Sequence, residues 1–384
     1  MIFAKMHFSH LHLTHFRNYA GLSLELSPGI NVITGNNGEG KTNILEAVHY
    51  LSMTRGWHSK TEKYALKENE QYFIVEGYLE DTDGRHNVQC NYLPPKGKKM
   101  ILDKRPLQKM SDHIGRIPSV AVLPSDTQLI DGGPGVRRKF MDSLICQYSQ
   151  EYLQKLIAYE HALLQRNALL TLMGERRKWD PEQLQLWSAQ LVEPGIFILE
   201  KRRQFLAKFL PAFLEYFRWI VSDKETPTIT LESQFVQNDA AEWLARFKSD
   251  EDRDRYSQRT NSGIHKDDLV LQIDGQGVKN YGSQGQQKTF VIALKMAQYA
   301  LLGEEKGLAP LLLLDDIFDK LDVHRLRAIA RMLDERVKGQ VLITDTSLER
   351  CSHVFSEVKT REIKYFYVAA ATVKPAPQDG HAQK

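Results

Sequence analysis

Hydrophobic and polar residues alternate along the N-terminal third of the chain, which is the period of strands that bury one face. Residues 11–16 and 22–26 follow this pattern. So do residues 72–79 and 87–93, which flank Asp81-Thr82-Asp83-Gly84, a polar sequence typical of a hairpin turn. The pattern therefore predicts an antiparallel, strand-rich region.

The hydrophobic period changes to that of helices in the middle of the chain. Apolar residues recur at helical spacing through residues 151–173 and 181–221, between Gln, Arg and Lys. Pro194 and Pro211 fall inside the second stretch, and because proline removes a helical hydrogen bond, we expect several helices there. Residues 240–256 have the pattern of one amphipathic helix.

The C-terminal third alternates between predicted strands and helices. A continuous apolar run over residues 308–314 is short enough to be a buried strand, and helices are predicted near 286–302 and 324–338. Residues 369–384 are small and polar and contain proline, so this end is predicted to be a disordered tail.

These changes of pattern divide the chain into parts at residues 1–125, 126–260 and 261–368, followed by the tail at 369–384. The fold class is α/β with an inserted helical lobe. No stretch reaches the roughly 18 consecutive apolar residues that a membrane helix needs, so no membrane partner is expected.

Composition narrows the class of protein. The chain is 42% hydrophobic and 26% charged, as ordinary globular proteins are. Its formal net charge is only +3, so a surface for nucleic acid has to be a local patch. Three distant cysteines, Cys90, Cys146 and Cys351, argue against a disulfide framework, and residues 1–16 lack the apolar core of a signal peptide. We therefore expect a cytoplasmic protein.

The sequence Gly35-Asn36-Asn37-Gly38-Glu39-Gly40-Lys41-Thr42 matches the phosphate-binding pattern G-x-x-x-x-G-K-[ST]. A predicted strand precedes it, and a predicted helix follows from Asn43. Glycines turn backbone N–H groups toward a phosphate, and the helix start adds donors and a positive dipole end. Residues 35–43 are therefore predicted to bind ATP, with Lys41 on the β- and γ-phosphates and Thr42 on Mg²⁺. The matching flanks disfavour a plain glycine turn.

Two acids, Asp315 and Asp316, follow the apolar run. If this strand is parallel to the P-loop strand and next to it, Asp315 lies beside Thr42 and holds Mg²⁺ directly or through water. Asp316 then faces the attacking water, as a general base or by orienting it. The alternative is a strand end whose acids only cap the next segment.

A second glycine loop, Ser283-Gln284-Gly285-Gln286, opens the helix predicted near residue 286. It has the small residues and backbone donors of another anion site. Two such helix ends of one subunit cannot readily share one γ-phosphate, so we expect Ser283, Gly285 and Gln286 to contact ATP held by a second copy. Asp322 is expected near that copy's P-loop. Ordinary helix capping is the alternative for both segments.

Together these motifs resemble the ATP-binding-cassette (ABC) heads of the SMC/Rad50 type, and more closely the RecF family of bacterial recombination and repair ATPases. Further matching blocks are Phe16-Arg17-Asn18-Tyr19, Asn43-Ile44-Leu45-Glu46-Ala47, Asp131-Gly132-Gly133-Pro134, Arg137-Arg138-Lys139-Phe140-Met141-Asp142, Gln165-Arg166-Asn167-Ala168-Leu169-Leu170 and Gly263-Ile264-His265-Lys266-Asp267-Asp268-Leu269. The resemblance covers nearly the whole chain except the tail.

The resemblance implies a P-loop ATPase head, with a mixed sheet and an antiparallel β-subdomain, formed by residues 1–125 and 261–368. Residues 126–260 become a helical arm. Lys41 and Thr42 correspond to Walker A and Asp315 and Asp316 to Walker B, with Lys41 and Asp316 catalytic. The implied trans-acting residues are Ser283 and Gly285 of the signature motif and Asp322 of the D-loop.

Two departures from most ABC proteins stand out. Asp316 occupies a position where most have glutamate, and its shorter reach fits slow hydrolysis. Thr344-Asp345-Thr346 stands where transporters carry a switch histidine.

The family implies a weak ATPase that forms an ATP-dependent homodimer and binds double-stranded and gapped DNA. It also implies cooperation with RecR, and indirectly with RecO, in loading RecA. An SMC-like DNA-organising ATPase without a gap-repair role remains an alternative. So does an ABC transporter ATPase subunit, which the missing switch histidine disfavours.

Basic residues gather in two places that could contact DNA phosphates. Residues 96–116 hold seven Lys or Arg against two Asp, and Lys96, Lys98 and Lys99 lie at a predicted turn. Arg137 and Arg138 form the second cluster. A solvated hairpin and ion pairing with nearby acids are the respective alternatives. Gln165-Arg166-Asn167 could face DNA or a partner subunit.

Overall fold

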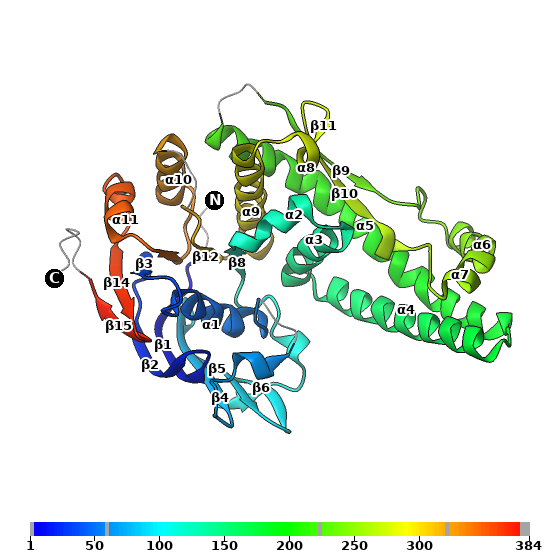
Figure 1. Cartoon of the computed structure of the whole chain (residues 1–384), viewed down its shortest axis with the longest axis horizontal. Helices are drawn as coiled ribbons and strands as arrows, with labels where there is room; N and C mark the ends of the chain where they lie inside the picture. The colour runs from blue at the N-terminus through cyan, green and yellow to red at the C-terminus, as the bar shows by residue number, and fades with distance from the viewer. Residues whose placement is uncertain (1–3, 58–60, 222–224, 319–322, 377–384) are drawn as a thin grey trace. The chain divides into compact units, whose positions relative to one another are not determined.

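The computed structural model describes residues 4–57, 61–221, 225–318 and 323–376, which fall into two compact units (Figure 1). The first, called here the head unit, comprises Met1–Asp126, Glu215–Lys224 and Gln284–Lys384. The second, called the helical unit, comprises Thr127–Leu214 and Glu225–Ser283.

Two six-stranded sheets form the framework of the head unit. One is antiparallel, in the order β2-β1-β4-β5-β6-β7. Its strands are β1 (His7–Phe16), β2 (Tyr19–Glu25), β4 (Phe73–Asp81), β5 (Gly84–Leu93), β6 (Gly97–Leu102) and β7 (Arg105–Pro106). It is the antiparallel β-subdomain that the sequence predicted.

The other sheet is mixed and has the order β15-β14-β3-β13-β12-β8. Its strands are β3 (Ile30–Gly35), β8 (Ser119–Val122), β12 (Leu311–Asp315), β13 (Val341–Asp345), β14 (Ile363–Ala369) and β15 (Thr372–Pro375). All neighbouring pairs are parallel except β14 with β15. The α/β head fold is thereby confirmed.

Helix α1 (Lys41–Met53) packs between the two sheets, because it contacts β4 and β5 of one and β3, β12 and β13 of the other. Ile44, Leu45, Val48 and Leu51 of this helix are fully buried in the core of the head unit. Burying each such side chain stabilises the fold by about 1.5–3 kcal/mol. This packing fixes the start of α1 and therefore the loop that precedes it.

Three further helices belong to the head unit: α9 (Gln284–Lys306), α10 (Val323–Glu335) and α11 (Leu348–Phe355). Helix α9 contacts β8, and α11 contacts β3. Short 3₁₀ turns at Glu62–Ala65, Met110–Asp112 and Pro124–Thr127 complete the connections.

The helical unit is built mainly from long helices, with a three-stranded antiparallel sheet, β11-β10-β9. The helices are α2 (Gln128–Asp131), α3 (Pro134–Tyr148), α4 (Gln150–Arg176), α5 (Pro181–Ile220), α6 (Ala240–Ser249), α7 (Glu251–Ser257) and α8 (Val278–Tyr281), with a 3₁₀ turn at Ile264–Lys266. The strands are β9 (Pro227–Glu232), β10 (Asp268–Ile273) and β11 (Gln276–Gly277). Residues 215–220 of α5 group with the head unit.

Two helix predictions were wrong. Helix α5 is continuous through Pro194 and Pro211. Each proline costs about 3 kcal/mol in a helix interior, but a buried stripe that includes Leu184, Leu191 and Ile198 offsets that cost. Residues 240–256, predicted as one helix, form α6 and α7, which are separated at Asp250, whose side chain bonds to Ser262 and Arg246.

Two predicted boundaries also differ from the structure. The predicted tail contains β15, which pairs with β14 through Val368 and Val373, so order extends further than expected; residues 377–384 lie outside the described part. Residues 261–283, placed by the sequence in the third part, group with the helical unit, because β10 pairs with β9.

Candidate functional site

The P-loop connects the fully buried strand β3 to the first turn of α1. Its last residue, Gly40, has φ of 108° in the left-handed region, which glycine adopts readily. Among the described residues, no side chain caps this helix end, and the first turn carries no acid. The start of α1 is therefore suited to bind an anion.

The turn between β1 and β2 supports this loop. Asn18 Nδ2 donates to the carbonyl oxygen of Glu39, and Asn43 Nδ2 donates to Asn18 Oδ1, both at 2.9 Å. The Tyr19 hydroxyl donates to the carbonyl oxygen of Gly40 at 3.2 Å. A Cβ atom at Gly40 would lie 2.5 Å from Asn18 Nδ2, so the close approach of the turn requires glycine there.

Lys41 folds back over the loop. Its Nζ donates to the carbonyl oxygens of Gly35 and Asn36, at 2.7 Å each. Burial lowers the pKa of Lys41, and the nearby carboxylates of Asp316 and Asp315 oppose that shift. The ammonium group is thus held against the loop backbone and close to acids, where phosphate oxygens would replace carbonyl oxygens as its partners.

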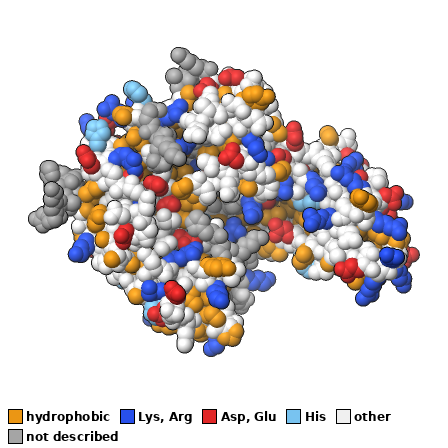
Figure 2. Space-filling view, in the orientation of Figure 1, with side chains coloured by type: hydrophobic (Ala, Val, Ile, Leu, Met, Phe, Trp, Pro, Cys, Tyr) orange, Lys and Arg blue, Asp and Glu red, His pale blue; other side chains and the backbone are white. Residues whose placement is uncertain are grey.

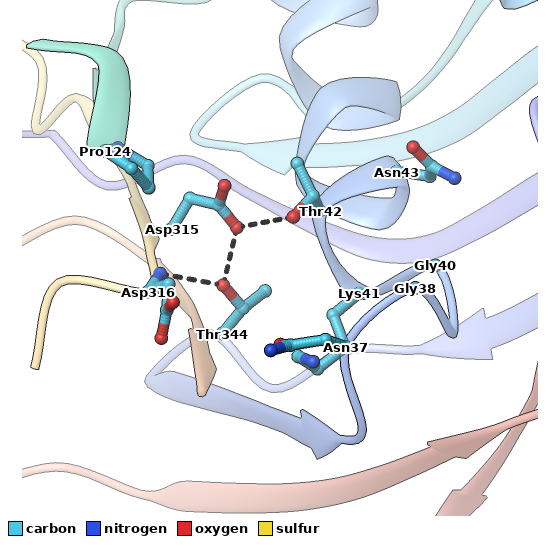
Figure 3. A pocket seen from close by; sticks show the side chains of 10 residues that line it. All are labelled: Asn37, Gly38, Gly40, Lys41, Thr42, Asn43, Pro124, Asp315, Asp316 and Thr344. Carbon is cyan, nitrogen blue, oxygen red and sulfur yellow. Dashed lines mark hydrogen bonds between the residues drawn. The ribbon is translucent and has the colours of Figure 1, made fainter. Parts of the chain in front are cut away.

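The carboxylate of Asp315 receives two hydroxyl hydrogen bonds on one oxygen (Figure 3). Thr42 Oγ1 donates to Asp315 Oδ1 at 2.8 Å, and Thr344 Oγ1 donates to the same atom at 2.7 Å. The predicted meeting of Thr42 and Asp315 is therefore present. Carboxylate and hydroxyl oxygens are the ligands that Mg²⁺ prefers, so this donor set fits a magnesium ion.

The predicted strand order around this contact was wrong in one respect. The strand ending in Asp315 is not the neighbour of the P-loop strand, because β13 lies between β12 and β3. The register pairs Thr344 of β13 with Asp315 on one side and with Ile33 on the other. Asp315 nevertheless reaches Thr42, since the carboxyl ends of all three parallel strands lie at the same sheet edge.

Asp316 follows β12 in an unusual backbone conformation. Its φ is 48°, in the left-handed region that non-glycine residues rarely adopt. Its N–H group donates to Thr344 Oγ1 at 3.0 Å, and its side chain lines the same pocket as Lys41. The pocket has a volume of ≈ 270 Å³ and brings together the predicted residues Lys41, Thr42, Asn43, Asp315 and Asp316 (Figure 3).

Comparison with known proteins decides the family. Residues 7–362 match the family described as "RecF/RecN/SMC N terminal domain". The chain is 37% identical over 372 residues to the DNA replication and repair protein RecF of Cytophaga hutchinsonii, with 97% of each chain covered. It is 39% identical over 347 residues to that of Flavobacterium johnsoniae, covering 90% of this chain and 95% of the relative.

The chain belongs to the RecF family. A solved structure described as the recombination mediator protein RecF-ATP in the RecFOR pathway superposes with a TM-score of 0.85 at 27% identity, covering 97% of this chain and 100% of that one. An Smc head domain from Pyrococcus yayanosii gives a TM-score of 0.58 at 14% identity, which shows the shared fold alone. As a RecF-family member, the chain is an ABC-type ATPase of DNA replication and repair.

The signature-like loop of this RecF-family chain lies at the start of α9. Helix α9 begins at Gln284, and a Cβ atom at Gly285 would lie 2.4 Å from Nη1 of the flexible Arg325 side chain, which would have to shift. Ser283 is exposed. Among the described residues that line the pocket, none comes from 283–286. The predicted Asp322 lies outside the described residues.

The predicted DNA-contacting residues of the head unit differ in their surroundings. Lys96 and Lys99 are exposed beside the β5–β6 turn. Lys98 instead forms an ion pair with Glu62, and its side chain is 15% exposed. In the view of Figure 2, Lys and Arg side chains are interspersed with Asp and Glu rather than gathered in one continuous patch.

The basic residues of the helical unit that the sequence singled out have partners within the unit. Arg137 makes a two-pronged ion pair with Asp268, at 2.6 and 2.8 Å. Arg138 donates to the carbonyl oxygen of Asp267 at 2.7 Å. For Arg137, the structure therefore agrees with the alternative to DNA contact, which was ion pairing with nearby acids. Arg166 is fully buried and paired with Asp254, so it faces neither DNA nor a partner subunit.

Sequence reasoning missed three residues of the site. Asn18 was noticed only within a block of family resemblance, and Thr344 only as part of a segment lacking a switch histidine. Pro124 also lines the pocket. The position of Thr344 at the end of an apolar strand was a signal, because polar residues at the carboxyl ends of parallel strands gather at one edge.

No helix among the described residues is long and apolar enough to cross a bilayer.

Proposed function

We propose that this protein is an ATP-gated clamp that dimerises on ATP, closes on duplex DNA near single-strand gaps and promotes loading of a recombinase. Slow hydrolysis of ATP then separates the two copies. The chemistry of the pocket, the absence of residues 283–286 from its described lining and the functions named for the relatives support different parts of this proposal.

ATP and Mg²⁺ are the proposed ligands. The loop N–H groups from Gly38 to Lys41 and the start of α1 would surround the phosphates, with Lys41 adding positive charge. Thr42 and Asp315 would supply oxygen ligands to Mg²⁺, and the ion would neutralise charge on the phosphates. A solved relative is described as RecF-ATP, which supports the choice of nucleotide.

Asp316 is proposed to act on the attacking water. Its side chain lines the pocket close to Lys41 and could accept the water proton, or orient the water, as the bond to the γ-phosphate breaks. An aspartate reaches less far than the glutamate found in most ABC proteins. This shorter reach supports slow ATP hydrolysis, which would set how long the dimer persists.

One observation carries the proposal of dimerisation: the described lining of the pocket includes Walker A and Walker B residues but no residue from 283–286. The helix N-terminus at Gln284, with Ser283 and Gly285, would complete the pocket from a second copy, and Asp322 would lie near the partner's P-loop. ATP would then join two copies because each copy contributes half of its surroundings.

The DNA and protein partners are proposed from the family. The relatives are named DNA replication and repair proteins, and the solved relatives are placed in the RecFOR pathway. We propose binding to double-stranded and gapped DNA, contact with RecR, and an indirect role with RecO and RecA, in the cytoplasm. Lys96 and Lys99 are the exposed candidates for phosphate contacts, whereas Lys98, Arg137 and Arg138 have protein partners.

The central test is particle size, measured by sedimentation with and without ATP and Mg²⁺. The wild type should dimerise only with ATP, Lys41→Arg should remain monomeric, and Asp316→Asn should accumulate as a dimer. Dimerisation of Lys41→Arg equal to that of the wild type would contradict the proposal, as would a monomeric Asp316→Asn.

Binding to gapped DNA distinguishes the proposed clamp from the main alternative, an SMC-like organiser. An SMC-like organiser without a repair role would bind intact and gapped duplex equally. Deleting its gene would not impair the repair of gapped DNA. The clamp should prefer gapped duplex when ATP is present. A transporter subunit would instead copurify with a membrane permease.

A further inference from the structure

Thr344 occupies the end of β13, between the strand of the P-loop and the strand of the acids. Its side chain is 1% exposed and lines the pocket. Its carboxyl-end position puts it at the sheet edge where Thr42 and Asp315 meet (Figure 3).

The Thr344 hydroxyl joins the two acids of the site. It donates to Asp315 Oδ1 at 2.7 Å and accepts from the backbone N–H group of Asp316 at 3.0 Å. A hydroxyl group has one proton to give and two lone pairs, so both bonds form at once, and their directions are fixed. A carboxylate cannot serve as donor, and an N–H group cannot serve as acceptor, so no other assignment is possible.

The backbone at Asp316 needs such a support. A left-handed conformation at a residue other than glycine costs about 1–3 kcal/mol and persists where its surroundings fix it. At Asp316 the φ is 48°, and its N–H group also lies 3.2 Å from the carbonyl oxygen of Thr344. Both contacts of this N–H group come from Thr344, which therefore supports the turn that leads into the Asp316 side chain.

The neighbouring acid, Asp345, also acts on Lys41 through its charge, but its hydrogen bonds go to other residues. Asp345 is fully buried, and its Oδ1 accepts from the N–H group of Ser347 and from Arg350 Nη2, both at 2.7 Å. These bonds tie Asp345 to the start of α11. Thr344, and not Asp345, therefore forms the hydrogen bonds to Asp315 and Asp316.

We propose that Thr344 is a positioning residue for hydrolysis: its hydroxyl fixes the Asp315 carboxylate toward Thr42 and holds the Asp316 backbone in the conformation that directs its carboxylate into the pocket. This inference rests on the proposed role of Asp316. It predicts two separable effects, one on the magnesium side through Asp315 and one on turnover through Asp316.

The test compares Thr344→Val, which keeps the shape of the side chain, with Thr344→Ser, which keeps the hydroxyl. Thr344→Val should lower kcat about 10- to 100-fold, from the loss of hydrogen bonds that include one to a charged group, and should raise the KM for ATP in the presence of Mg²⁺ about tenfold. Thr344→Ser should keep kcat within about threefold. Equal losses in both variants would overturn the inference, because packing would then explain them.

Binding measurements add a readout that does not depend on turnover. For Thr344→Val, calorimetry should show weaker binding of ATP with Mg²⁺, about tenfold, and unchanged binding of ATP in excess chelator. The melting temperature without ligand should stay close to that of the wild type. An equal weakening with and without Mg²⁺ would overturn the proposed link through Asp315.

A double-mutant cycle with Asp316→Asn separates this inference from the proposed function. If Thr344 acts on turnover through Asp316, the double variant should be no slower than Asp316→Asn alone. Additive losses would overturn the inference and leave the role of Asp316 intact. An unchanged kcat in Asp316→Asn would instead refute the catalytic role, and with it the inference.

Discussion

Thr42 and Asp315 lie 273 positions apart in the chain, and their side chains meet at 2.8 Å in the head unit. Thr42 lies in the first turn of helix α1, and Asp315 ends strand β12. The contact joins the glycine loop and the acidic strand into one site, which neither motif could form alone.

Removing the Thr42 hydroxyl should weaken the binding of ATP with Mg²⁺. A hydrogen bond to a charged group contributes about 1.5–3 kcal/mol, so Thr42→Val should raise the Kd roughly 10- to 150-fold. Thr42→Ser, which keeps the hydroxyl, serves as the control and should bind within a few-fold of the wild type. If calorimetry gave Thr42→Val the same Kd for ATP with Mg²⁺ as the wild type, the proposed role of Thr42 as a magnesium ligand would be refuted.

Asn18→Ala should loosen the P-loop without altering any residue that lines the pocket. The variant loses the bond to the Glu39 carbonyl and the bond from Asn43. Each is worth about 1 kcal/mol, so ATP affinity should fall by up to about 30-fold if both losses act on binding. Asn43→Ala alone should cost less, since it leaves the Glu39 contact in place. A larger loss in Asn43→Ala would point to direct contact of Asn43 with the nucleotide.

Replacing the exposed lysines Lys96 and Lys99 by glutamate should weaken DNA binding at every sequence tested. If each neutralises one phosphate, the slope of log K against log salt should become shallower by about 2. Lys359→Glu, at an exposed lysine of the head unit outside the predicted basic turn, controls for the charge change of each single variant. A salt slope unchanged from the wild type would place the DNA surface elsewhere.

Asp254→Ala should destabilise the helical unit strongly. Arg166 and Asp254 are both 0% exposed and are joined at 2.7 Å, so the variant leaves a buried cation without its counter-ion. Such a loss costs about 3–5 kcal/mol. Glu193→Ala breaks the largely exposed pair with Lys155 and should cost less than about 1 kcal/mol. Similar shifts of the urea midpoint for both variants would contradict this contrast.

The stability of the helical unit should fall as the solution is acidified. Burial lowers the pKa of His265 to about 4, with Lys266, Arg138 and Arg166 adding repulsion against a bond to the Thr260 carbonyl. Between pH 6.5 and 4 the unfolded chain binds a proton that the folded chain does not. His265 therefore contributes a decrease in unfolding free energy of about 1.4 kcal/mol per pH unit in that window.

Denaturant titrations at several pH values check this sign. His265→Gln lacks the titrating group, so its stability should vary less between pH 6.5 and 4 than that of the wild type. Identical pH profiles for the two proteins would show that His265 does not titrate in this way.

Local patterns carried much of the fold prediction. Strand alternation located β1, β4 and β5, and the glycine loop with its flanks located β3 and the start of α1, because these features depend on neighbouring residues. The continuity of α5 was not predictable in this way. Its prolines oppose a helix locally, and only the burial of the stripe through Leu191 and Ile198 overrides them.

The sequence by itself determined which residues carry the chemistry: Lys41, Thr42, Asp315 and Asp316 stand in short motifs whose residue types suit phosphate and magnesium. Only the tertiary structure decided which residues hold them. Thr344 acquires its place through the insertion of β13 between β3 and β12, and Asn18 through a turn that packs on the loop. Such contacts depend on strand order and register, which are set by packing between segments distant in sequence.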